Sequence, residues 1–489
     1  MVKKICVIGS GFAGLSAACH LAKRGYDVTI LEKNSMIGGR ARVYQDQGFT
    51  FDMGPSWYWM PDVFERFFAN FGKKPSDYYE LIRLDPSYSV KFKDERVEIP
   101  ANMSELEHLF DKIEPGSHLQ LRMFLKQAKY KYEVGINDLV YKPSRSLIEF
   151  ADMRLLHGLI KMDVFTSMRK HVYKFFKHPK LRELMEFPIL FLGATPQNTP
   201  ALYSLMNYAD ISLGTWYPMG GMHMIVKGMA SLAEELGVKI LTSKEVTGFT
   251  YEAKTIKEVV AGNENHTFDI VVAGADYHHI DQNILAPEYS NYTSNYWDKR
   301  TMAPSSLLFY LGVDKELPEL LHHTLFFDED FNVHAKEIYE TPKWPSKPLL
   351  YTSAASKTDP TIAPKGKENL MVLIPVAPGL QDTEDIREKY FNLAIDRLEK
   401  YTNTAIKDHL SVKRSYAHKD FSSDYHSFKG NAYGLANTLL QTAILKPSLK
   451  NRKLKNLYFT GQLTVPGPGV PPSLISGEVV AKEIEKDFN

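Results

Sequence analysis

The sequence is poor in cysteine and has no long hydrophobic run. Its 489 residues include only two cysteines, Cys6 and Cys19. Both lie among apolar residues and lack metal-ligand spacing, so they predict small buried side chains in a reduced cytosolic setting. Apart from the glycine-rich stretch 5–22, no run approaches the roughly 18 apolar residues that a membrane-spanning helix needs. We therefore expect neither a secretory signal nor a spanning helix.

An excess of charge of one sign is also absent. The chain has 59 Lys plus Arg against 58 Asp plus Glu, which gives no global electrostatic reason to bind nucleic acid. No Ser-His-Asp, cysteine-nucleophile or metal-ligand pattern is recognisable. The histidines of the pairs 278–279 and 322–323 are sequence neighbours that do not converge easily on one ion, so we expect surface histidines and no metal. The chemistry must then belong to a cofactor.

What the sequence does contain is a nucleotide-binding unit at its start. An apolar strand (5–8) runs directly into three glycines spaced G-x-G-x-x-G, which are Gly9, Gly11 and Gly14. The first glycine permits a tight turn, the second lets a pyrophosphate approach the backbone, and the third lets the following helix pack closely on the strand. The positive end of that helix then faces the phosphates. In this setting the motif predicts dinucleotide binding rather than a structural turn.

Two features downstream distinguish FAD from NAD. A second apolar strand (26–31) ends at Glu32, where a carboxylate accepts hydrogen bonds from a ribose. Gly38-Gly39-Arg40 follows after a short loop and lets the backbone and a cation approach a second part of the cofactor. Taken alone, this segment is equally a surface turn with a solvated arginine. Together, however, E-x(5)-GGR resembles a signature of the FAD-dependent amine-oxidase-like superfamily, which implies FAD.

The other end of the chain narrows the resemblance. Residues 457–481 read LYFTGQLTVPGPGVPPSLISGEVVA, which predicts a strand, a Gly/Pro-rich loop and a helix that starts near Ser473. Alone, 466–472 is simply a rigid loop. With the N-terminal unit, it resembles the C-terminal signature of bacterial-type phytoene desaturases. The segments GTWYPMGGM (214–222) and NAYG (431–434) resemble two further elements of that family.

This resemblance implies a set of site residues. Those that it assigns to the cofactor are Gly9, Gly11, Phe12, Ala13, Gly14, Glu32, Lys33, Gly38, Gly39, Arg40, Gly54, Pro55, Val246, Gly461, Gly469 and Val470. Those that it assigns to the substrate are Trp216, Tyr217 and Tyr433. Asp152 and Arg154 loosely match a family segment that faces the flavin, although the family's arginine stands one position later. Asp152 would take a proton or steady a cationic transition state, and the alternative is an ordinary pair on a helix surface.

The fold class that follows is α/β, with a Rossmann-like FAD-binding domain and a discontinuous α+β substrate domain. We expect residues 1–72, 215–295 and 430–489 to form the FAD-binding domain, and 73–214 and 296–429 the substrate domain. The stretch 269–276 is apolar on both faces, as a buried parallel strand requires. We expect mostly helix over 100–210, strands at 306–313, 351–354 and 370–375, and one long helix over 382–410.

The function that the resemblance implies is FAD-dependent desaturation of a long polyene. A hydride passes to the flavin and a proton leaves the neighbouring carbon, which adds one double bond. The substrate would be a hydrophobic carotenoid held in an apolar tunnel, either phytoene or a 1-hydroxycarotenoid that gains a 3,4 double bond, with oxygen or a quinone as electron acceptor. A flavin amine oxidase, a carotenoid isomerase and a non-enzymatic lipid-binding protein of the same architecture stay open as alternatives.

One local charge bias indicates a membrane surface. Residues 161–180 carry six Lys or Arg and one Asp, interleaved with aliphatic and aromatic residues. Such a segment can lie in a bilayer interface with its lysines near anionic lipid. A core-packed helix with a solvated basic face is the alternative. Because the family draws its substrate from membranes, we expect a cytoplasmic protein that is peripherally associated with the inner face of the membrane.

Overall fold

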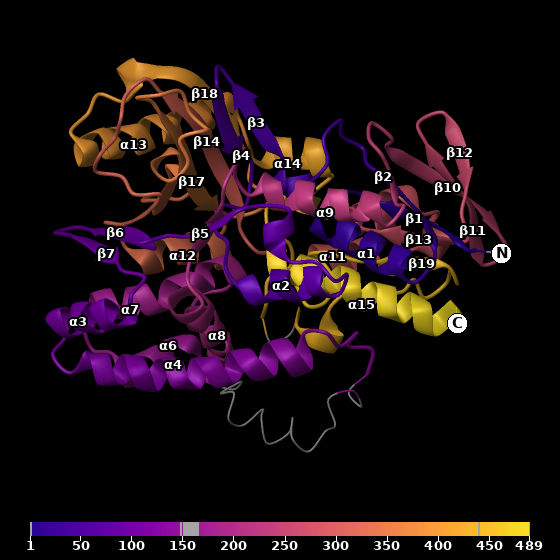
Figure 1. Ribbon diagram of the computed structural model, residues 1–489, viewed down its shortest axis with the longest axis horizontal. Helices are drawn as coiled ribbons and strands as arrows, with labels where there is room; N and C mark the ends of the chain where they lie inside the picture. The colour runs from indigo at the N-terminus through magenta and orange to yellow at the C-terminus, as the bar shows by residue number, and fades with distance from the viewer. Residues whose placement is uncertain (1, 147–148, 150–165, 439–440, 489) are drawn as a thin grey trace.

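The computed structural model describes residues 2–146, 149, 166–438 and 441–488 (Figure 1). One layer is a five-stranded parallel sheet with the strand order β19-β13-β1-β2-β9. Its strands are β1 (Lys4–Ile8), β2 (Asp27–Leu31), β9 (Lys239–Leu241), β13 (Ile270–Ala273) and β19 (Leu457–Phe459). The beginning, the middle and the end of the chain therefore all contribute strands to this sheet. A parallel sheet of this kind is typical of a Rossmann-like α/β fold.

Helices α1 (Phe12–Lys23), α9 (His223–Glu235) and α15 (Val470–Phe488) pack on this sheet. α1 and α15 cross at close range at Gly477, which has no side chain. A Cβ added there would lie 2.6 Å from the carbonyl oxygen of Ala13, so a larger residue would not fit. The crossing holds the first turn of α1 beside the first turns of α15. Cys6 in β1 and Cys19 in α1 are completely buried, which confirms that both act as small core side chains.

The second layer is a seven-stranded sheet in the order β18-β14-β17-β16-β15-β6-β7. Its strands are β6 (Tyr88–Phe92), β7 (Arg96–Ile99), β14 (Ser305–Val313), β15 (His323–Phe327), β16 (Leu350–Ser353), β17 (Glu368–Val376) and β18 (Leu410–Tyr416). Neighbouring strands are antiparallel except for the parallel pair β15 and β6. The three strands expected between 306 and 375 are thus confirmed as β14, β16 and β17.

The expected long helix over 382–410 is only partly present. α13 spans Glu384–Thr402 and packs on one face of the seven-stranded sheet. It ends because Asn403 takes a left-handed conformation with φ of 48°, a common way to terminate a helix. The chain then enters β18, which pairs with β14. Residues 403–409, including a 3-10 turn at Lys407–His409, therefore connect the helix to the strand, and periodicity did not reveal where the helix stops.

A helical layer lies on the opposite side of the seven-stranded sheet, at the lower left of Figure 1. It contains α3 (Met103–Ile113), α4 (Ser117–Val134), α6 (Met168–Phe175), α7 (Pro179–Glu186) and the short α8 (Leu205–Asn207). Met168, Val172 and Phe176 are completely buried, and Arg169 forms an ion pair with Glu186 at 2.8 Å. These three apolar side chains therefore pack in the core, whereas Tyr173 of α6 exposes 43% of its surface, and contact of this segment with a membrane stays a prediction.

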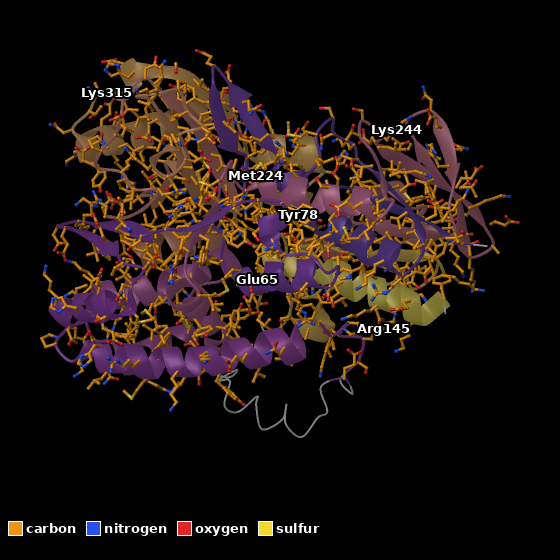
Figure 2. All side chains as sticks on the ribbon, in the orientation of Figure 1. Glu65, Tyr78, Arg145, Met224, Lys244 and Lys315 are labelled. Carbon is orange, nitrogen blue, oxygen red and sulfur yellow. The ribbon has the colours of Figure 1, made fainter. Side chains whose placement is uncertain are left out.

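Smaller elements connect these layers. They are β3 (Val43–Asp46), β4 (Phe49–Asp52), α2 (Pro61–Ala69), β5 (Leu81–Arg83), β8 (Trp216–Pro218), β10 (Val246–Glu252), β11 (Thr255–Ala261), β12 (Glu264–Thr267), α10 (Tyr277–His279), α11 (Ser294–Asp298), α12 (Phe331–Tyr339) and α14 (His418–Tyr425). In Figure 2, Lys244 marks the approach to the β10–β12 sheet, and Arg145 lies beside the end of α15, where it pairs with Glu483. In the described ranges, no helix is both long and apolar enough to cross a membrane.

Candidate active site

A cavity of about 750 Å³ is lined by residues from both sheets. We call the part that carries charged groups its polar end; it includes Glu32, Lys33, Arg40, Glu245, Asp276, His279, Asp424 and His426. We call the part lined by aromatic and aliphatic side chains its apolar end; it includes Trp57, Trp59, Met60, Ile136, Leu139, Leu205, Met206, Leu308, Tyr351, Leu373 and Tyr433. The volume lies within the range of about 300–1,000 Å³ found for ligand pockets.

The structure brings most of the residues that the sequence analysis selected into this one cavity. Those that line it are Gly9, Gly11, Phe12, Ala13, Glu32, Lys33, Gly38, Gly39, Arg40, Gly54, Pro55, Val246, Tyr433, Gly461, Gly469 and Val470. Gly14 does not line it. A Cβ at Gly14 would lie 2.0 Å from the carbonyl oxygen of Gly9, so this glycine permits close packing of α1 against the turn, as the motif requires.

The first turn of α1 supplies unpaired donors to the polar end. Gly11 is the N-cap of α1 and offers no side-chain cap, and the first turn carries no acidic residue. The first backbone N–H groups of a helix have no partner within the helix, so at this cavity-lining turn they are available to an anion. Gly39 has a φ of 55°, and a Cβ there would lie 3.3 Å from Cα of Gly11. The two glycine segments therefore form a narrow cradle that suits a pyrophosphate.

Glu32 is fixed as an acceptor at the carboxyl end of β2. It is buried, and it accepts hydrogen bonds from the backbone N–H of Ser10 at 2.9 Å and from Asn34 at 2.8 Å. The Ser10 hydroxyl donates a further bond at 2.7 Å. The Asn34 side chain donates a fourth bond at 3.1 Å, so both carboxylate oxygens are held in place at the cavity wall. Its position at the end of a parallel strand suits a ribose.

Arg40 and Asp276 place opposite charges in the polar end. The Arg40 guanidinium bonds to Ser427 and to the carbonyl oxygen of Asn431, while its Nε has no partner among the described groups. Burial raises the pKa of Asp276 to about 6, against the opposing effect of the Arg40 charge. An unpartnered Nε beside a cavity is consistent with a cation that meets a bound anion there.

Sequence reasoning missed several residues of the polar end. Asp276 follows β13, and the carboxyl ends of parallel strands meet at one edge of a sheet. Its place beside the cofactor site could therefore have been predicted from the sequence. Glu245 and His426 are joined at 2.7 Å, and His426 stacks on His279 with ring centroids 3.8 Å apart. These groups come from three separate segments, and no motif in the sequence predicts that they lie close together.

Trp216 and Tyr217 lie apart from the other selected residues. Both belong to β8, which pairs with β5, and neither lines the large cavity. Tyr217 instead lines a small separate pocket with Asp52 and His322. Burial raises the pKa of Asp52 to about 7, and its carboxylate accepts bonds from the backbone at the start of α9. The resemblance assigned both residues to the substrate, and the structure does not place them at the wall of the large cavity.

The histidine pair 322–323 is buried, so the expectation of surface side chains is wrong for it. His323 is the first residue of β15, and His322 directly precedes it. Trp57 stacks on His323 with ring centroids 4.1 Å apart. Within the described ranges, no group of three His, Cys, Asp or Glu side chains is placed to hold a metal ion. Asp152 and Arg154 lie outside the described residues, and their roles stay predictions.

Comparison with known proteins identifies the family. A model of the flavin-containing amine oxidoreductases matches residues 12–485. The chain belongs to this family. It is accordingly an oxidoreductase with FAD as its cofactor, and the cradle, the ribose acceptor and the unpartnered arginine described above fit that cofactor.

Curated relatives within the family are carotenoid desaturases. The chain is 41% identical to a carotenoid 3,4-desaturase of Haloarcula japonica, over 99% of this chain and 98% of the relative. It is 31% identical to a zeta-carotene-forming phytoene desaturase of Myxococcus xanthus, over 99% and 94%. The chain therefore belongs to the carotenoid desaturase branch of the family. An oxidoreductase structure from Methanosarcina mazei shares the fold, with a TM-score of 0.63 at 16% identity over 99% of this chain and 100% of that one.

Proposed function

We propose that the chain desaturates a carotenoid and that it forms a 3,4 double bond at a hydroxylated end. The observation that carries the proposal is the continuity of the cavity, which joins a nucleotide-type polar end to an apolar end lined by aromatic and aliphatic side chains. The greater identity to a 3,4-desaturase than to a phytoene desaturase, 41% against 31%, supports the choice of bond. A 1-hydroxycarotenoid is the substrate class that follows.

The protein's part in the reaction is to bind, orient and exclude water. The α1 turn, Glu32 and Arg40 would hold FAD by its phosphates and ribose, and Gly461, Gly469 and Val470 would contact it from the α15 side. Bound FAD supplies the hydride acceptor. The apolar end binds a polyene by burying its surface, at roughly 25 cal/mol per Å², and it keeps the reacting carbons dry and close to the cofactor.

The apolar end argues against an amine substrate. The residues that we assign to the apolar end are aromatic and aliphatic, and none of them carries a carboxylate. An alkylammonium group buried there would lack a counter-charge, which is costly. A flavin amine oxidase is therefore the less favoured function, and an isomerase is separated from a desaturase by the fate of the flavin electrons.

The proposed function is tested by offering two substrates to the purified FAD-loaded protein in liposomes. One tube contains phytoene and the other a 1-hydroxycarotenoid, and products are followed by absorption spectrum and chromatography. We expect one added double bond in the hydroxylated carotenoid only. Stepwise red-shifted products from phytoene would overturn the 3,4 assignment, and unchanged carotenoids in both tubes would overturn desaturation itself.

We further propose that the protein is cytoplasmic and docks on the inner face of the membrane through α4. Leu119, Met123 and Tyr130 of this helix expose 53%, 47% and 38% of their surface, and α4 runs along the lower edge of the molecule in Figure 1. Exposed Lys126 and Lys129 flank them, which suits anionic lipid. The chain continues from α4 into 135–144, which contributes cavity-lining residues, so a carotenoid would enter from the lipid side.

Oxygen or a membrane quinone is the proposed electron acceptor. The sequence contains one G-x-G-x-x-G unit, and we assign that unit to FAD. A soluble nicotinamide would need a second nucleotide site of this kind. A quinone would reach the cavity by the same lipid-facing entrance as the carotenoid.

A further inference from the structure

A hydrogen-bonded chain leads from the apolar end of the cavity into the seven-stranded sheet. Ser56 and Tyr351 both line the cavity, and their hydroxyl oxygens are 2.8 Å apart. The Tyr351 hydroxyl lies 2.7 Å from Nδ1 of His323. His323 is completely buried, and its Nε2 has no hydrogen-bond partner among the described groups. The chain therefore connects the cavity surface to a ring nitrogen that can hold a proton.

Other hydroxyl groups at the apolar end have different partners. Tyr433 is hydrogen-bonded to Ser306, and Tyr203 is hydrogen-bonded to Thr442. Both of these partners are hydroxyl groups, which do not store a proton near neutral pH. The hydrogen bond of Tyr351, by contrast, leads to an imidazole.

We propose that Ser56, Tyr351 and His323 form the relay that removes the substrate proton during desaturation; this rests on the proposed function. The hydrogen of one substrate C–H bond leaves with the bond's electron pair as a hydride, for which bound FAD would be the acceptor. The electron pair of the neighbouring C–H bond becomes the new π bond, and its proton passes to the Ser56 oxygen. Ser56 gives its own proton to Tyr351, and Tyr351 gives its proton to Nδ1 of His323. Both hydroxyl groups are restored with reversed orientation, and the imidazole carries the proton.

A weak base is sufficient for this step. As the hydride departs, positive charge develops on the adjacent carbon and makes the neighbouring C–H bond strongly acidic, so a hydroxyl group backed by an imidazole can accept the proton. Burial holds the pKa of His323 well below its usual value, which keeps the ring neutral and ready to accept. The same burial makes the imidazolium short-lived. When oxygen or a quinone takes two electrons and two protons, the hydride supplies one hydrogen and the relay returns the other.

The relay is tested by the rate of flavin bleaching when FAD-loaded protein meets a 1-hydroxycarotenoid without oxygen. Tyr351→Phe keeps the ring but breaks the link between Ser56 and His323. We expect it to slow bleaching at least about tenfold, the order of a lost acid–base contribution, with carotenoid affinity little changed. The wild type should also slow in heavy water, because the relay protons exchange with solvent, and Tyr351→Phe should lose this solvent effect.

Two further variants separate a relay from a structural contact. Ser56→Ala should be as slow as Tyr351→Phe, Ser56→Thr should recover most of the rate, and the double variant Ser56→Ala/Tyr351→Phe should be no slower than either alone, because the steps are in series. Tyr310→Phe is the matched control. Its hydroxyl is also buried and donates to the carbonyl oxygen of Met53 at 2.7 Å, but it does not line the cavity, so it should bleach at the wild-type rate.

The outcomes distinguish the two proposals. A wild-type protein that does not desaturate the carotenoid overturns the proposed function. A wild type that desaturates, with a Tyr351→Phe variant equally fast and equally sensitive to heavy water, overturns the relay alone. FAD content and the midpoint of thermal unfolding are measured for each variant. If Tyr351→Phe is slow because it has lost FAD or its fold, the relay is judged from Ser56→Ala against Ser56→Thr, which differ in the hydroxyl group.

Discussion

Lys446 is a charged side chain enclosed by the protein. It exposes 5% of its surface, and its Nζ has no hydrogen-bond partner in the described part of the chain. Asn437 and Lys446 both approach Gly467, where an added Cβ would lie 3.2 Å from the lysine Nζ. Burial lowers the pKa of Lys446 to about 7, whereas an unfolded lysine holds its proton up to about pH 10.4.

This difference predicts a pH-dependent stability. Between about pH 7 and pH 10 the unfolded chain holds a proton that the folded chain has lost, so the contribution of Lys446 to stability rises with pH. Lys446→Met should raise the free energy of unfolding at pH 7, by about 1–3 kcal/mol, and the gain should shrink toward pH 10. Thermal unfolding at both pH values measures it. Lys254→Met, at an exposed position, is the control that should show neither effect; a destabilised Lys446→Met at pH 7 would contradict the account.

Single residues differ in how far the sequence reveals their role. The positions of Gly11 and Glu32 at the cavity wall were predictable, because nucleotide binding requires fixed residue types at fixed spacing along one βαβ unit; their contacts with a pyrophosphate and a ribose stay predictions. Ser56 and Tyr351 were not, because they are 295 residues apart in the chain and meet only in the folded protein. An ordinary serine and an ordinary tyrosine carry no local pattern that marks them as partners.

At the scale of secondary-structure elements, local sequence patterns predicted whether a segment is a helix or a strand better than they predicted what packs against it. β1 and β13 were predictable from continuous apolar runs, as buried parallel strands require. For the basic segment around α6, the sequence left a membrane surface and core packing open, and the structure buries Met168, Val172 and Phe176 in the core. Periodicity gives the face of a helix that avoids water, but tertiary structure decides whether protein or lipid covers that face.

α4 is the element on which membrane docking is tested. The double variant Leu119→Gln/Met123→Gln removes exposed apolar surface without touching the buried face of the helix, so the fold should be retained. We expect co-sedimentation with anionic liposomes to fall several-fold, because interfacial binding scales with the apolar area that is buried. Val333→Gln on α12 is the matched control, since Val333 is also exposed, at 40%. Equal binding by all three proteins would rule out α4 as the docking face.

At the scale of the whole molecule, the fold class was predictable and the domain division stays a prediction. The strands of the parallel sheet come from the ranges 1–72, 215–295 and 430–489 that we propose for the FAD-binding domain. A nucleotide-binding fold can be recognised from sequence because the residues that typically contact the phosphates and the ribose lie close together in the chain. The apolar end of the cavity was not predictable residue by residue, because its wall is built from distant segments whose side chains resemble ordinary core.

The central claim is that FAD and a carotenoid meet in one cavity and exchange a hydride there. The most direct measurement is a single turnover without oxygen, in which the FAD-loaded protein is mixed with a 1-hydroxycarotenoid and the flavin absorption and the carotenoid products are followed together. We predict one new double bond for each flavin that is bleached. An isomerised or unchanged carotenoid beside a flavin that stays oxidised would contradict the account.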